Sequence, residues 1–143
     1  MDPRLQLYQD IVQAVHEQVP EIGHIDLWNQ NVYYMEQDCE WQRPALFVEI
    51  GDIEWQPMKQ DSQGRYLRGS GDVRLHIVTD WSEDAYATSF ELGDKIWRAL
   101  EDHAEGDGKA YRMEYPKASL TNHDHEAMLE NIDVLGAHYV KRW

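Results

Sequence analysis

Hydrophobic and polar positions recur with two different periods along this chain, and each change of period marks a new element. From residue 3 to 18, apolar side chains recur every three or four positions after Pro3, which predicts an N-terminal helix. Pro20 ends this pattern, and a period of two in residues 24–28 predicts a short strand. Residues 29–43 are polar and aromatic without a sustained period, so we expect a loop there.

The middle of the chain carries the strongest strand patterns. The almost wholly apolar run 45–50 predicts a central strand that is covered on both faces. Gly51-Asp52 predicts a tight turn, after which residues 53–57 alternate like a second limb with one wet face. The polar stretch from Lys59 to Gly71 contains three glycines and predicts a flexible loop. The alternating residues 73–81 predict a long strand whose apolar face needs a helix against it.

The C-terminal part continues with one helix and two strands. Ser82 is a suitable N-cap, and residues 82–100 predict a helix with an apolar stripe of Tyr86, Phe90, Gly93, Ile96, Trp97 and Leu100. Residues 109–120 read as a strand interrupted near Pro116, which indicates a sheet edge or a bulge. Residues 128–140 alternate as a final strand.

These elements predict an α+β fold. We expect one domain over residues 1–143, since a chain of 143 residues is long enough to bury a single core. No βαβ unit repeats, so the sheet should be mainly antiparallel and twisted, with both helices packed on one face.

Charge narrows the choice of partner. The chain has 27 acidic and 13 basic side chains, a net charge of −14, and therefore repels nucleic-acid backbones and anionic lipid heads. The charge is uneven: residues 21–61 carry −7 and residues 82–108 carry −6, whereas residues 62–81 carry +1. Identical copies could thus pair head to tail, basic loop against acidic face, and close a ring.

Cysteine content and hydropathy indicate the compartment. Cys39 is the only cysteine, so no disulfide forms within the chain and a reducing environment is expected. No signal-peptide core follows Asp2, and the apolar runs are far shorter than the roughly 20 residues that a bilayer requires. We therefore expect a cytoplasmic protein.

Candidate chemistry is sparse, and we expect no catalytic residue, no resident metal and no cofactor. His123 and His125 would share one side of an extended segment and form the single metal candidate, but Asn and Asp around them are also typical turn formers. His76 lies on the polar side of the long predicted strand, which indicates a surface or interface histidine. These observations favour a non-enzymatic protein.

The whole pattern resembles a viral protein family. Pro44-Ala45-Leu46-Phe47-Val48-Glu49-Ile50, Trp55, the stretch from Gly71 to Asp80 and the helix Phe90–Leu100, with Asp124-His125-Glu126 before the last strand, are similar to tail-terminator or tail-completion proteins of long-tailed phages. The resemblance implies a prophage-encoded subunit that forms a ring, commonly of six copies. The ring would cap the tail tube and meet the head-side connector, first in the host cytoplasm and then in the virion tail or neck.

On this interpretation the loop from Lys59 to Gly71 reaches a neighbouring subunit or the tube through Arg65, Tyr66 and Arg68. The predicted interface set is completed by Trp55 and Trp41. Two other classes stay open: a monomeric acidic module of the adaptor or immunity type that binds a protein or peptide, and a metal-dependent enzyme built on His123 and His125.

Overall fold

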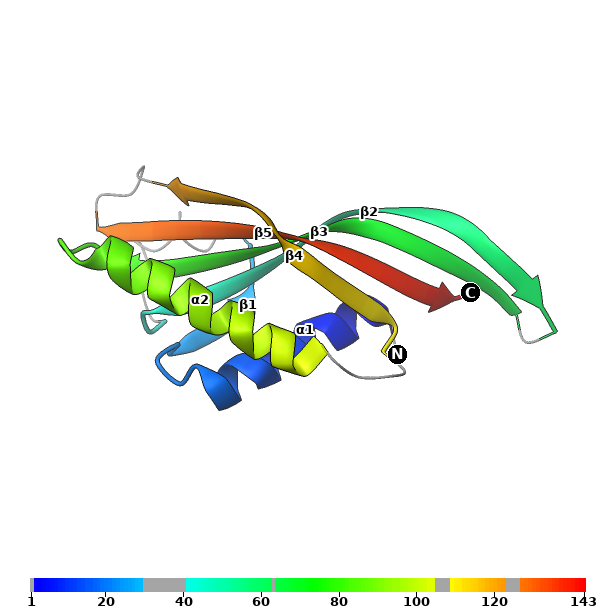
Figure 1. The fold of residues 1–143 in the computed structure, drawn as a ribbon, viewed down its shortest axis with the longest axis horizontal. Helices are drawn as coiled ribbons and strands as arrows, with labels where there is room; N and C mark the ends of the chain where they lie inside the picture. The colour runs from blue at the N-terminus through cyan, green and yellow to red at the C-terminus, as the bar shows by residue number, and fades with distance from the viewer. Residues whose placement is uncertain (1, 30–40, 63, 105–108, 123–126) are drawn as a thin grey trace.

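The computed structural model describes residues 2–29, 41–62, 64–104, 109–122 and 127–143. In chain order its elements are α1 (Pro3–Gln18), β1 (His24–Leu27), β2 (Ala45–Asp61), β3 (Gly64–Asp80), α2 (Ala85–Ala104), β4 (Tyr111–Asn122) and β5 (Met128–Arg142). The strands form one sheet in the order β1-β2-β3-β5-β4, in which β1 is parallel to β2 and the other pairs are antiparallel. Both helices lie on one face of the twisted sheet (Figure 1), which confirms the predicted α+β class.

The helix α1 follows the predicted bounds. The Asp2 side chain accepts a hydrogen bond from the backbone N–H of Arg4 and caps the helix, and Pro3 takes the first turn, where a missing N–H costs nothing. Leu7, Ile11 and Val15 are fully buried against the sheet. These positions are one helical turn apart, as the predicted period requires, but the apolar Leu5 of the same period is 47% exposed.

The helix α2 forms where predicted but is rotated about its axis. Ala85, Ser89, Leu92 and Ile96 face the sheet, whereas Phe90 is 52% exposed and Tyr86 is half-buried. The predicted stripe through Tyr86 and Phe90 is therefore wrong at its N-terminal end. Small residues occupy much of the side of α2 that faces the sheet, because the helix lies close to the sheet. A Cβ on Gly93 would already be 3.2 Å from Oδ2 of Asp133.

The predicted turn at Gly51-Asp52 and the predicted loop from Lys59 to Gly71 are both wrong. Strand β2 runs on to Asp61 with a register shift between Ile50 and Ile53, and β3 begins at Gly64, where φ is +136°. Gly69 and Gly71 do not form a loop but leave room for groups of the paired strand β2 to lie close to β3. A Cβ on Gly71 would lie 2.4 Å from the carbonyl oxygen of Asp52 on the paired strand.

The long hairpin gives the molecule an arm. We call residues 53–61 of β2 and 64–71 of β3 the hairpin arm, which extends past both helices beside the C-terminus (Figure 1). Strand β5 supports it along much of its length, since the pairing with β3 continues to Tyr66 and Arg142. Strand β1 pairs with Ala45–Val48, so among the described residues no strand lies beside the β2 side of the arm, which is a sheet edge there.

The remaining strand predictions agree with the structure. Strands β1 and β5 match residues 24–28 and 128–140 within two residues at each end. Strand β4 is the other sheet edge and shifts register on both sides of Pro116, as the proline indicated. In the described ranges, no helix is both apolar enough and long enough to cross a bilayer.

Candidate functional site

The hairpin arm carries a group of cations held over aromatic rings. The Nζ of Lys59 lies 4.9 Å from the ring centroid of Tyr66, and the guanidinium of Arg65 lies 5.5 Å from that of Trp143. The backbone N–H of Trp143 donates to the carbonyl of Arg65 at 2.7 Å, which ties the last residue of the chain to the arm. Such contacts position a charge without removing it from solvent, so the arm presents ordered basic groups at the surface.

Three predicted interface residues, Arg65, Tyr66 and Arg68, therefore share one structural unit. Arg65 and Arg68 are exposed, and Tyr66 is half-buried. Residues 57–68 and 140–142 contain five basic side chains and one acidic side chain, a net charge of +4. On a protein of net charge −14, these residues therefore form a distinctly basic surface. The role of Arg65, Tyr66 and Arg68 at an interface stays a prediction.

Trp55 belongs to the same arm but lies on its helix side. It pairs with Gly69 across the hairpin, where a Cβ would come within 2.8 Å of the indole ring. Its ring centroid is 6.2 Å from that of the fully buried Tyr139. Trp55 thus joins the arm to the main core, and this contact stiffens the arm where it leaves the body.

Trp41 is not part of the arm. Its ring stacks on His24 at 6.1 Å and meets Phe47 edge-on at 5.0 Å, and the guanidinium of Arg43 lies 5.7 Å from its centroid. Phe47, with Trp41 packed against it, belongs to a second apolar cluster on the sheet face away from the helices. The predicted interface set is consequently divided between two places in the fold.

A buried ionisable cluster lies beside this second cluster. His76 is only 3% exposed, so the expectation of a surface histidine is wrong. Its Nδ1 is 2.7 Å from Oε2 of Glu130, its Nε2 is 3.0 Å from Oε1 of Glu49, and its ring stacks on Trp28 at 3.9 Å. The flanking carboxylates replace water as hydrogen-bond partners, which is why a polar residue is accommodated here.

This cluster does not form a catalytic arrangement. Both ring nitrogens of His76 already contact carboxylate oxygens, so neither is free to activate a nucleophile or bind a metal. Across the part of the chain that the structure describes, no three His, Cys, Asp or Glu side chains are placed to hold a metal ion. The candidates His123 and His125 lie outside the described residues.

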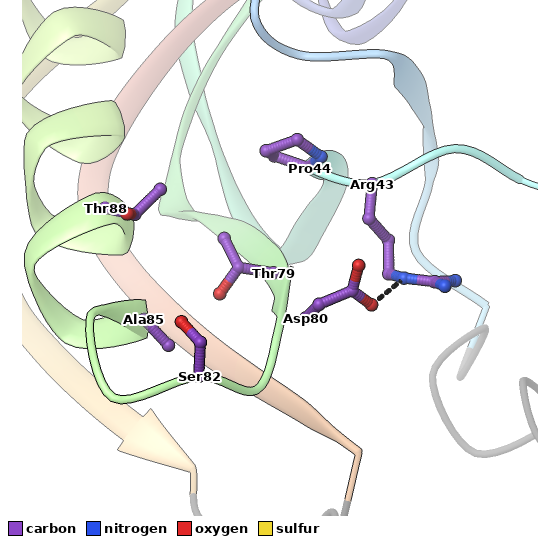
Figure 2. A pocket seen from close by; sticks show the side chains of 7 residues that line it. All are labelled: Arg43, Pro44, Thr79, Asp80, Ser82, Ala85 and Thr88. Atoms are coloured by element: carbon purple, nitrogen blue, oxygen red, sulfur yellow. Dashed lines mark hydrogen bonds and ion pairs between the residues drawn. The ribbon is translucent and has the colours of Figure 1, made fainter.

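A small cavity lies where the ends of β2, β3 and α2 meet (Figure 2). It encloses about 190 Å³ and is lined by Arg43, Pro44, Thr79, Asp80, Ser82, Ala85 and Thr88. Nε of Arg43 is hydrogen-bonded to Asp80 on one side of the cavity, which balances the charge of both groups. The carboxylate among these lining residues, that of Asp80, is engaged by Arg43, so it is not arranged as a base for a lining hydroxyl.

Polar bonds from α1 secure the two C-terminal strands near the base of the arm. Asp10 accepts from Nζ of Lys109 at 2.8 Å and from the hydroxyl of Tyr111 at 2.5 Å. Burial, and then the bond to Asp10, raises the pKa of Tyr111. Asp2 accepts from Lys141 at 2.9 Å, and its bond to Arg4 holds the pKa of the Asp2 carboxyl well below the usual range. These bonds fix α1 against the sheet.

Comparison with known proteins finds similarity at the level of the fold. The fold is similar to that of a chain in the virion of a native gene transfer agent particle, with a TM-score of 0.52 and 13% sequence identity. The similarity covers 94% of this chain and 95% of that one, so the fold is shared almost from end to end. No family model matches the sequence, and no curated protein matches it.

Proposed function

We propose that this chain is a non-enzymatic structural protein of a phage-like particle, and that it forms a ring which ends the tail tube or joins the tail to the head. The observation that carries the proposal is the fold similarity to a chain of a gene transfer agent virion, which extends over nearly the whole of both chains. It agrees with the resemblance of the sequence to tail-terminator and tail-completion proteins.

The distribution of charge supports assembly from identical copies. The basic arm lies at one end of the long axis and α2 begins at the other end (Figure 1). By sequence, residues 82–108, which include α2, carry −6. A protein with complementary patches at different places forms head-to-tail contacts, and such contacts close into a ring when the rotation per copy divides a full turn. Six copies is the number we propose.

The remaining acidic surface suits the inside of such a ring. DNA that passes through a tail must slide without adhering, and carboxylates repel its phosphates. The partners on this proposal are other copies of the chain, the tail-tube protein below the ring and the head-side connector above it. The protein would reside in the host cytoplasm before it enters the virion tail or neck.

Solution mass tests the ring. We expect light scattering over a concentration series to show a closed oligomer that dissociates as salt rises, since screening weakens contacts between exposed charges. Arg65→Ala with Arg68→Ala should lower the oligomer fraction. Arg112→Ala with Lys117→Ala is the matched control, because it removes the same charge from β4 at the sheet edge.

Two outcomes would count against this function. A strict monomer at every concentration, which also fails to bind purified tail-tube protein, would favour the monomeric binding module instead. An oligomer whose mass is the same in the arm variant and in wild type would remove the arm from the interface, although the ring itself would stand.

A further inference from the structure

Three aromatic rings form an exposed group at the start of α2. Trp81 and Phe90 are 51% and 52% exposed, and Tyr86 lies between them. The Trp81 and Tyr86 rings meet edge-on at 5.7 Å, and the Tyr86 and Phe90 rings are tilted at 6.2 Å. The group is continuous and half exposed, which is unusual for rings of this size unless a partner covers them.

Acidic side chains surround these rings. Residues 80–94 contain five Asp or Glu and no Lys or Arg. Asp80 is paired with Arg43 and Asp94 with Arg98, whereas Glu83, Asp84 and Glu91 are exposed and lie within two residues of one of the aromatic residues in sequence. We call Trp81, Glu83, Asp84, Tyr86, Phe90 and Glu91 the α2 patch. Aromatic faces flanked by carboxylates provide the two contacts that a guanidinium or ammonium group prefers.

The fold places the acidic α2 patch far from the basic hairpin arm. The α2 patch lies at one end of the longest axis and the hairpin arm at the other (Figure 1), so the two surfaces of one copy do not meet. The arm carries Lys59, Arg65 and Arg68, and residues 57–68 together with residues 140–142 of the neighbouring strand β5 carry a net charge of +4. The α2 patch is acidic and the arm is basic, and both surfaces carry aromatic rings. Because they lie at opposite ends of one copy, the patch of one copy can meet the arm of the next.

We infer that the α2 patch binds the hairpin arm of a second copy of this chain. The inference rests on the proposed ring and names its acceptor surface. Arginines of the arm would lie against Trp81 and Phe90 and pair with Glu83 and Glu91, in the same cation-over-ring geometry that Arg65 already adopts with Trp143.

Side chains, not strand pairing, make this contact. The free edge of the arm carries Pro57, which has no backbone N–H to donate, and a register shift between Pro57 and Lys59. Both features discourage addition of another strand at that edge. An arm whose edge disfavours strand addition offers its rings and cations as binding groups.

Two complementary variants test the inference. Phe90→Ala with Glu91→Lys disables the patch and leaves the arm intact, whereas Arg65→Glu with Arg68→Glu disables the arm and leaves the patch intact. Each variant alone should associate at least about 10-fold more weakly than wild type, the effect expected of a central aromatic and its charge partner. An equimolar mixture should form a dimer and stop there, because only one competent interface remains in each pair.

The controls separate this inference from the ring itself. Leu5→Ala with Glu17→Lys makes the same kind of change on exposed positions of α1 and should assemble as wild type does. Thermal melts followed by circular dichroism check that every variant folds. A patch variant that folds and assembles like wild type, or a mixture that stays monomeric, overturns the inference and leaves the ring in place. A wild-type protein that never associates overturns both.

Discussion

The buried cluster around His76 gives the sharpest test of the structure. His76→Phe keeps a flat ring against Trp28 but removes both nitrogens from Glu49 and Glu130. Glu49 is 28% exposed and can return to water, whereas Glu130 is 2% exposed and cannot. Taking the partner from a buried ionisable pair costs about 3–5 kcal/mol, so we expect the free energy of unfolding to fall by about that amount.

This loss is large beside the total stability of a domain. Globular domains are typically stable by about 5–15 kcal/mol, so the variant should lose a third or more of its margin. Glu130 keeps the hydrogen bond that it accepts from Nδ2 of Asn122 at 2.9 Å, which favours the lower half of the range. Urea unfolding followed by tryptophan fluorescence and by circular dichroism measures the change directly.

A second substitution distinguishes the buried charge from simple loss of packing. Glu130→Leu in the His76→Phe background removes the stranded carboxylate, so the double variant should be more stable than His76→Phe alone by about 1–3 kcal/mol. A cost below about 1 kcal/mol for His76→Phe, or strict additivity of the two changes, would refute the argument that the histidine neutralises a buried acid.

Three further measurements follow from individual contacts. Gly71→Ala should lower stability by about 1–3 kcal/mol in thermal melts, because its Cβ would clash with the Asp52 carbonyl 2.4 Å away, and a wild-type melt would contradict that approach. Burial raises the pKa of Tyr139 from 10.0 to about 12. The contribution of the neutral hydroxyl to stability should therefore be complete below pH 10 and be lost as the pH rises toward 12. Ultraviolet titration of wild type against Tyr139→Phe detects the ionisation of this tyrosine. Trp97→Phe removes the indole N–H donated to Oδ2 of Asp133 at 3.1 Å and should cost about 1–2 kcal/mol in urea unfolding; an unchanged midpoint would show that water replaces the bond.

Local signals were sufficient where the deciding interaction is itself local. Pro3 and the period of three or four residues located α1, and Pro116 located an irregular edge strand. Both depend on backbone chemistry within a few positions, which the sequence displays directly. The basic character of Arg65 and Arg68 was visible in the same way, because charge density needs no knowledge of contacts.

Glycines misled the prediction because their role was not local. Gly51, Gly69 and Gly71 read as turn and loop residues, but they permit close approach between two strands that pair along the whole hairpin. A glycine has the same appearance in sequence whether it bends the chain or makes room for a neighbour. The hairpin arm was consequently missed as a unit, although Arg65, Tyr66 and Arg68 within it were already named as candidate interface residues.

The α2 patch was missed for a related reason. Helical periodicity admits two adjacent stripes, and the bulkier one, through Tyr86 and Phe90, was taken as buried. The spacing of Ala85, Ser89 and Gly93 was the signal available, since small residues one turn apart indicate close packing against a sheet.

The sequence by itself determined the α+β class, the order of most elements and the uneven charge, because these depend on periodicity and composition. Tertiary structure alone decided which face of α2 is covered, how far the hairpin extends and that His76 lies between two glutamates. Each of those outcomes depends on groups far apart in the chain, such as His76 and Glu130, that meet only when the strands pair in register. Register is a property of the assembled sheet, and one residue of slip would turn every side chain to the opposite face.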